Sequence, residues 1–327
     1  MTANAEKIVP KAFVWRRLHS LLGLWLVLFL FEHLITNSQA ALWLGDDGIG
    51  FVRMVNLLYS LPYLQAVEIA LLGIPILTHG ALGIKYIFSA KMNSQKTDGT
   101  KPQMKYGRNR AYSWQRYTSW ILLFGLIFHV VQMRFLERPE KVARGNQDEY
   151  LAPLDLDDGL YTLAARLDVS LYSSNDILAL EKETKMVPAF PEDFKSPKPV
   201  RFNEEKEKKL IEIQTENEYT NWAHSLSNYK ISDTQVVSSS KSPGVATLLS
   251  VRNTFKNPFM CILYTVFVLA AVYHAFNGLW TFMISWGAIL SFRSQKKMVN
   301  FCIGLMLLVL FLGLASIWGS YWINLRT

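Results

Sequence analysis

Four of the six histidines of this 327-residue chain lie inside long apolar stretches: His33, His79, His129 and His274. Ionisable side chains are costly in a membrane interior, and those found there commonly serve a function. A single histidine of this kind would be explained by a hydrogen bond between helices, whereas four on successive stretches require a joint explanation. Imidazole is a good ligand for iron, and a proton relay is the other common role of intramembrane histidine.

The stretches that carry them are long enough to cross a bilayer, which takes about 20 mostly apolar residues. Half of the residues are apolar and 18% are charged, against about 25% charged in an average soluble domain. Inside lipid the backbone must satisfy its own hydrogen bonds, so we expect helices. The length and the charges Glu32 and His33 argue against a signal peptide in the first stretch. The five predicted spans are 18–43, 62–89, 113–136, 257–290 and 299–323.

Basic residues predict the orientation of these spans. The N-terminal segment and the connections between spans 2 and 3 and spans 4 and 5 carry 15 basic residues against two acidic ones, Glu6 and Asp98. Cytoplasmic loops are enriched in Lys and Arg, so these segments, with the N-terminus, are predicted to be cytoplasmic. The C-terminus is then extracytoplasmic, in a membrane of the bacterial inner type. This basic face accounts for the net charge of +8, and no nucleic-acid partner is implied.

The predicted fold is an all-α membrane protein, a five-helix bundle with a large extracytoplasmic insert between the third and fourth helices. The chain divides into 1–136 with the first three helices, 137–256 as the insert, and 257–327 with the last two. Within the insert, 156–167 and 203–219 have helix-like composition, 187–200 is proline-rich and expected to be extended, and 236–244 is expected to be a linker. We expect the insert to be a cap or docking surface.

The depth of each histidine follows from the helix rise of ~1.5 Å per residue. His33 and His129 are about 24 and 20 Å from the inner edge, whereas His79 is about 9 Å from it. His274, sixteen residues past Pro258, is again near the inner leaflet. The histidines therefore form two predicted pairs, His33 with His129 and His79 with His274.

Two imidazoles that face each other in a bundle suit a bis-histidine haem. Zinc would require four ligands in one place, and the two cysteines lie on opposite sides of the membrane. We therefore predict two b-type haems, with a proton relay as the open alternative. Arginine binds carboxylates well, so the inner haem's propionates are expected near Arg17, His19, Ser20 and Arg116.

Four segments resemble the membrane cytochrome b subunit of succinate:quinone oxidoreductases, in the five-helix, single-chain, two-haem type. They are RRLHSLLGLWLVLFLFEHLITN at 16–37, ILTHGALGIKY at 76–86, SWQRYTSWILLFGLIFHVVQ at 113–132 and LAAVYHAFNGLW at 269–280. The resemblance covers all five spans but not the long insert.

The resemblance implies an anchor that passes electrons between an iron–sulfur subunit and a membrane quinone, with menaquinone as the expected quinone. A flavoprotein subunit would interconvert succinate and fumarate. His79 and His274 would hold the haem nearer the iron–sulfur subunit, and His33 and His129 the distal one. The first-helix residues His19 and Ser20 match relatives' propionate-binding positions.

The quinone site of this type lies near the distal haem, and Glu68, about 16 Å outward of His79, is the candidate for proton exchange there. Val272 stands where some fumarate reductases of the family have a proton-transferring glutamate, so that path is not expected. Two alternatives stay open: a cytochrome b anchor of a hydrogenase or formate dehydrogenase, and a haem-free proton-coupled transporter.

Overall fold

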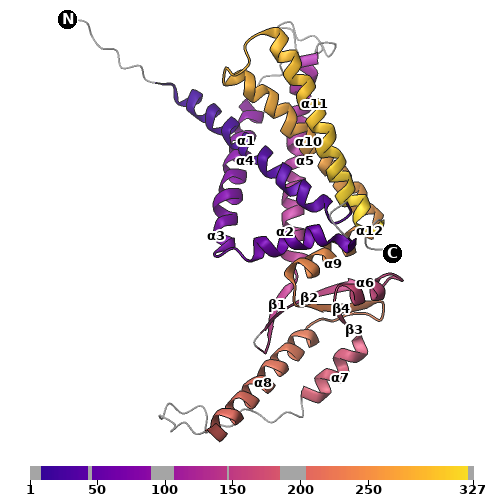
Figure 1. Ribbon diagram of the computed structural model, residues 1–327. Coiled ribbons are helices and arrows are strands. Elements are labelled where there is room, and N and C mark those ends of the chain that lie inside the picture. The colour runs from indigo at the N-terminus through magenta and orange to yellow at the C-terminus, as the bar shows by residue number, and fades with distance from the viewer. Residues whose placement is uncertain (1–8, 43–45, 90–106, 146, 185–203, 323–327) are drawn as a thin grey trace, which may run out of the picture. The chain divides into compact units, whose positions relative to one another are not determined.

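The computed structural model describes residues 9–42, 46–89, 107–145, 147–184 and 204–322 (Figure 1). The chain forms two compact units. The first comprises Met1–Gln39, Ser60–Val131 and Pro258–Trp318, and the second comprises Ala40–Tyr59, Gln132–Asn257 and Gly319–Thr327.

The first unit is entirely helical in its described part. Its helices are α1 (Lys11–Ser38), α3 (Leu64–Glu68), α4 (Ile74–Ser89), α5 (Gly107–Val130), α10 (Pro258–Ser285) and α11 (Phe292–Leu314). The π-helical turn η2 (Ile69–Gly73) joins α3 to α4, and two further π-helical turns, η3 (Val131–Leu136) and η5 (Ala315–Gly319), extend α5 and α11.

Five continuous helices are long and apolar enough to cross a membrane. The predicted five spans are thus confirmed, although their limits shift. The first helix begins at Lys11 rather than residue 18 because it includes the basic anchor residues. Many apolar side chains point outward from this unit, among them Leu77 and Phe124, which suits lipid surroundings. The protein is a multi-pass membrane protein.

Helix α10 is central in the first unit, since it packs against α1, α5 and α11. Glycines permit two of these close approaches: a Cβ on Gly125 of α5 would lie 2.4 Å from the Phe267 ring, and one on Gly313 of α11 would lie 2.6 Å from Val268. Small residues at helix crossings are typical of membrane bundles.

The second unit contains a four-stranded antiparallel sheet, so the all-α prediction is wrong for this part of the chain. The strands β1 (Glu140–Arg144), β2 (Gln147–Asp155), β4 (Gln235–Ser240) and β3 (Ser170–Tyr172) lie in the order β1-β2-β4-β3. The predicted linker 236–244 is mostly the inner strand β4. Its serines made it look like a linker, yet Ser238 is buried and donates to the Ala152 carbonyl at 3.0 Å.

The second unit also contains helices, some of which pack on the sheet and some on α9. They are α2 (Ile49–Tyr59), α6 (Leu160–Arg166), α7 (Ser174–Thr184), α8 (Glu204–Ser227) and α9 (Pro243–Phe255), with the short η1 (Asp46–Gly48) and α12 (Ser320–Trp322). The helical predictions at 156–167 and 203–219 are confirmed by α6 and α8. The proline-rich segment 187–200 lies outside the described residues.

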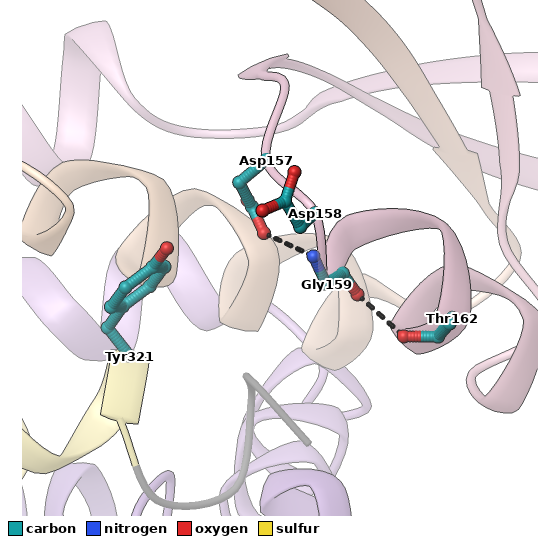
Figure 2. Close-up of a pocket in the computed structure, with 5 residues that line it drawn as sticks. All are labelled: Asp157, Asp158, Gly159, Thr162 and Tyr321. Atoms are coloured by element: carbon teal, nitrogen blue, oxygen red, sulfur yellow. Dashed lines mark hydrogen bonds between the residues drawn. The ribbon is translucent and has the colours of Figure 1, made fainter.

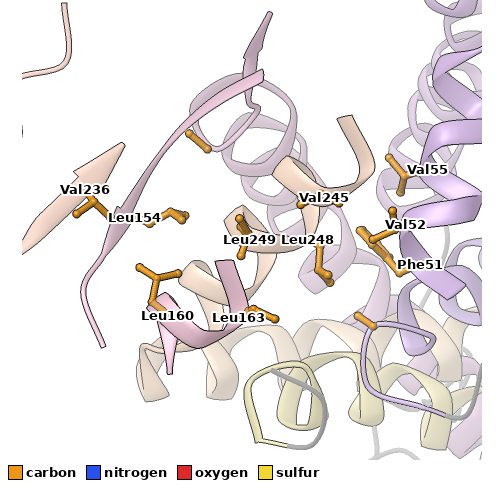
Figure 3. Packing of buried hydrophobic residues seen from close by; sticks show 12 residues of the cluster. Phe51, Val52, Val55, Leu154, Leu160, Leu163, Val236, Val245, Leu248 and Leu249 are labelled. Atoms are coloured by element: carbon orange, nitrogen blue, oxygen red, sulfur yellow. The ribbon is translucent and has the colours of Figure 1, made fainter. Parts of the chain in front are cut away.

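Two apolar clusters hold the second unit together. In the larger one, α2, α6 and α9 meet β2 and β4 (Figure 3), with Leu248 of α9 beside Phe51 and Val52 of α2. In the other, Trp222 and Leu226 of α8 pack with residues of β2, β4 and α7. These helices have apolar side chains at helical spacing, and burying that face in the core stabilises them.

Candidate functional site: two histidine pairs

The structure brings the four intramembrane histidines together as two pairs. The rings of His33 (α1) and His129 (α5) have centroids 5.8 Å apart. The rings of His79 (α4) and His274 (α10) have centroids 6.4 Å apart, and in both pairs the ring planes are inclined by 82°. These are the partners that the depth argument paired.

The spacing suits one metal ion between two imidazoles. With metal–nitrogen bonds of ~2 Å, two rings on opposite sides of a metal have centroids about 6 Å apart. Among the described residues no group of three or more His, Cys, Asp or Glu side chains could hold a metal ion. A site with only two protein ligands fits a haem iron, because the porphyrin supplies the remaining ones.

All four rings use Nδ1 toward a neighbouring polar atom. His79 Nδ1 is 3.0 Å from the His19 carbonyl, and His274 Nδ1 is 3.4 Å from Thr118 Oγ1. His129 Nδ1 is 3.2 Å from the Tyr264 hydroxyl. Since ligating histidines commonly bond through their other ring nitrogen, these contacts leave Nε2 of His79, His274 and His129 for a ligand.

The contact of His33 is weaker than the other three. Its Nδ1 is 3.5 Å from the Asn37 side-chain amide, which also donates to the His33 carbonyl at 2.7 Å. A separation of 3.5 Å is at the limit of a hydrogen bond. His33 is therefore held mainly by packing, including the Phe29 ring at 5.3 Å.

Gly23 of α1 makes room for His79. A Cβ at this glycine would be 3.0 Å from His79 Cε1, closer than side chains normally approach. A Cβ at Gly80, next to His79 in the chain, would meet no atom within 4 Å among the described residues. The two glycines therefore play different parts, and only Gly23 borders the imidazole.

Three of the four predicted propionate residues, Arg17, His19 and Ser20, lie close together on α1. His19 stacks on His79 at 4.0 Å with an interplanar angle of 14°. Ser20 donates to the Arg17 carbonyl and accepts from Trp286 Nε1 at 2.8 Å. Arg17 donates to the Ser285 carbonyl, so it links α1 to the end of α10. Their role toward propionates stays a prediction.

The other two candidates are Arg116 and Glu68. Arg116 of α5 stacks over the Tyr112 ring at 4.2 Å and donates to its hydroxyl. Glu68 is the last residue of α3, directly before the π-helical turn η2, and its role at a quinone is still a prediction. Val272 is buried in α10 two residues before His274, and it has no titratable group.

Sequence reasoning missed the polar side chains that brace His274. Gln115 donates to the His274 carbonyl at 3.2 Å and accepts from Asn277 at 2.6 Å. Asn277 in turn accepts from Trp280 Nε1 at 2.8 Å. Asn277 lies one helical turn after His274, so this spacing was the signal that could have found it. Gln115 lies on α5, and only packing brings it to His274.

A second site candidate is a pocket in the second unit (Figure 2). It is lined by Asp157, Asp158, Gly159, Thr162 and Tyr321. Asp157 is already engaged, since it accepts from Gly159 N at 3.0 Å and pairs with Arg252 and Lys256. The pocket has neither imidazole nor thiol to offer a metal, and the histidine pairs are the stronger candidate site.

Five long apolar helices, four of which carry the two imidazole pairs, define a helical membrane protein. The chain is similar to the succinate dehydrogenase cytochrome b558 subunit of Bacillus subtilis (strain 168), with 34% identity over 135 residues. The match covers 41% of this chain and 58% of that protein. No family model matches the chain, and no solved structure matches it.

Proposed function

We propose that this chain is the di-haem cytochrome b anchor of a succinate:quinone oxidoreductase in a bacterial-type inner membrane. The observation that carries the proposal is the two half-buried imidazole pairs, in which Nδ1 of His79, His274 and His129 is engaged and Nε2 is left for a ligand. The name of the similar protein, a succinate dehydrogenase cytochrome b558 subunit, supports the assignment to this kind of complex.

In this proposal His79 and His274 hold one haem b, and His33 and His129 hold the other. A bound haem would supply reversible one-electron transfer within the membrane. The residues of this chain bind and orient it, while Gly23 gives the imidazole of His79 its room.

The partners follow from the kind of complex proposed. The flavin and the iron–sulfur clusters are placed on two other subunits, which bind the basic cytoplasmic face and carry out the succinate chemistry. The electron acceptor or donor in the membrane is a quinone, with menaquinone favoured, and Glu68 is the proposed proton-exchanging residue.

The optical difference spectrum of the purified protein tests the haem assignment. We expect two low-spin b-type haems per chain, and loss of one of them in His274→Ala and of the other in His129→Ala. His224→Ala is the matched control, because His224 is exposed on α8, and it should keep both. A parent protein without haem would favour the proton-coupled transporter instead.

Copurification tests the choice of complex. We expect a flavoprotein and an iron–sulfur protein to accompany the chain, and succinate to reduce its haems only in their presence. A nickel- or molybdenum-containing partner would instead assign the anchor to a hydrogenase or a formate dehydrogenase.

A further inference from the structure

The hydrogen-bond partner of His79 determines where its proton lies. The partner at 3.0 Å is the His19 backbone carbonyl, and a carbonyl oxygen can only accept a hydrogen bond. His79 Nδ1 must therefore carry the proton. In the neutral ring the other nitrogen, Nε2, then presents a lone pair, which is the state that a metal needs.

The same reasoning applies to His274 through a different group. The hydroxyl of Thr118 has one hydrogen, and it donates that hydrogen to the Trp114 carbonyl at 2.8 Å. Toward His274 Nδ1, 3.4 Å away, the hydroxyl can then only accept. Thr118 is itself buried, so water does not compete for this contact.

Groups on the neighbouring helices also hold His79 and His274 in place. His79 reaches the α1 carbonyl because Gly23 lacks a Cβ, which would stand 3.0 Å from the imidazole. The carbonyl of His274 accepts from Gln115, one helical turn before Thr118 on α5. Both imidazoles are therefore oriented by groups that lie on a neighbouring helix rather than on their own.

We propose that two groups position the ligands of the His79–His274 haem. One is Thr118 of α5, and the other is the part of α1 that holds the His79 ring, namely Gly23 and the His19 carbonyl. They hold both imidazoles in the tautomer with the proton on Nδ1 and direct both Nε2 lone pairs at the iron. This inference rests on the proposed haem function. No comparable acceptor fixes His33 among the described residues, since its neighbour Asn37 offers a donor at 3.5 Å.

The expected consequence is electronic as well as geometric. A hydrogen bond accepted from Nδ1–H makes the ligand more basic, and a more basic ligand favours ferric over ferrous iron. Loss of the acceptor at Thr118 should raise the midpoint potential of this haem. Loss of an outer-shell partner also weakens metal-site affinity by roughly 10-fold or more, so retention of this haem should fall.

Redox titration and EPR of the purified holoprotein test the proposal, with the His79–His274 haem identified as the signal absent from His274→Ala. Thr118→Val removes the hydroxyl at nearly constant volume, whereas Thr118→Ser keeps it. We expect Thr118→Val to raise the potential and alter the low-spin EPR signal of this haem alone, and Thr118→Ser to behave like the parent. Equal shifts in both variants, or no shift in either, would overturn the role of Thr118.

A second pair of variants tests the role of Gly23 and leaves Thr118 unchanged. Gly23→Ala should displace His79 and change the same haem signal, whereas Gly80→Ala, where the space is open, should not. If Thr118→Val does not assemble, this pair decides the outcome, and identical spectra for both alanine variants overturn the proposal. A parent chain that binds no haem is a different result, because it refutes the proposed function itself.

Discussion

Arg252 is the most deeply buried charged side chain described in the second unit, and it depends on a carboxylate. Its side chain is 1% exposed, and its guanidinium donates to both oxygens of Asp157 at 2.6 and 2.7 Å. Its Nε has no hydrogen-bond partner among the described residues. Removing one partner of a buried ion pair leaves an uncompensated charge, which costs about 3–5 kcal/mol.

Asp157→Asn should therefore destabilise the second unit by about 3 kcal/mol. The matched control is Asp158→Asn, because Asp158 is the exposed neighbour and surface changes usually stay within about 0.5 kcal/mol. Hydrogen exchange of peptides from β2 and α9 in the full-length protein measures both. Equal protection in the two variants would contradict the importance of this pair.

The same carboxylate predicts a pH dependence. Burial alone would raise the pKa of Asp157, but the hydrogen bonds and charges of Arg252 and Lys256 outweigh it and hold the pKa well below the ordinary value. A lowered folded pKa means stability that is complete above the unfolded pKa of ~3.9 and is lost as the pH falls below it.

Exchange protection of β2 and α9, corrected for the intrinsic effect of pH on exchange, should therefore fall below about pH 4. Asp157→Asn has no carboxylate to protonate, so its protection should depend less on pH in this range. A parallel decline in the parent and in Asp157→Asn would assign the acid sensitivity to other groups.

At the scale of elements, Trp25 supplies a hydrogen bond that Pro75 removes from the second membrane helix. Pro75 has no N–H, so the Leu71 carbonyl four residues earlier lacks its usual helical donor. Trp25 of α1 supplies the missing hydrogen bond, with Nε1 2.7 Å from the Leu71 oxygen. Lipid offers no replacement donor, and the contact joins the helix that carries His19 to the one that carries His79.

Trp25→Phe should cost about 1–3 kcal/mol of stability in detergent or lipid, because it leaves the Leu71 carbonyl unpaired. In a Pro75→Ala background the alanine N–H can serve this carbonyl, so Trp25→Phe should cost less there. Unfolding of the four proteins in a double-mutant cycle gives the coupling energy. Additive effects would mean that Trp25 acts only through packing.

A second element-scale prediction concerns the crossing of α2 and α9 in the second unit. A Cβ on Gly244 would lie 2.5 Å from the Val52 carbonyl oxygen, and Asn56 accepts from Gly244 N at 2.8 Å. Gly244→Ala must push the two helices apart, at a cost of about 1–3 kcal/mol. Gly304→Ala in α11, where nothing lies within 4 Å among the described residues, should leave thermal unfolding unchanged or slightly improved.

Elements that local sequence patterns define could be predicted, whereas elements that depend on contacts between distant parts of the chain could not. The membrane helices follow from local apolar runs, and the histidine depths follow from the helix rise alone, which is why both pairs were anticipated. Strand β4 was missed because Val236–Ser240 is short and serine-rich, and only its pairing with β2, more than 80 residues earlier in sequence, makes it a strand. Thr118 and Trp25 were missed because their partners lie on other helices.

At the scale of the whole molecule, the sequence could not show which distant segments share a unit. Residues 40–59 stand between two membrane helices, yet Phe51, Val52 and Val55 pack into the core with Leu154 and Leu248. The acidic, mixed α/β unit and the basic loops of the helical unit differ in charge and composition. This difference is the basis of the predicted orientation, since Lys and Arg concentrate on the cytoplasmic side.

Single cysteines can test that orientation, because both native cysteines, Cys261 and Cys302, are buried. Lys241→Cys places a thiol on the exposed turn between β4 and α9, and Lys296→Cys places one in the exposed first turns of α11. A membrane-impermeant maleimide applied to intact cells with a permeable outer layer should label Lys241→Cys and spare Lys296→Cys, which should react only after lysis. The reverse pattern would put the second unit in the cytoplasm, on the side proposed for the flavoprotein and iron–sulfur subunits, and would contradict the anchor's proposed topology.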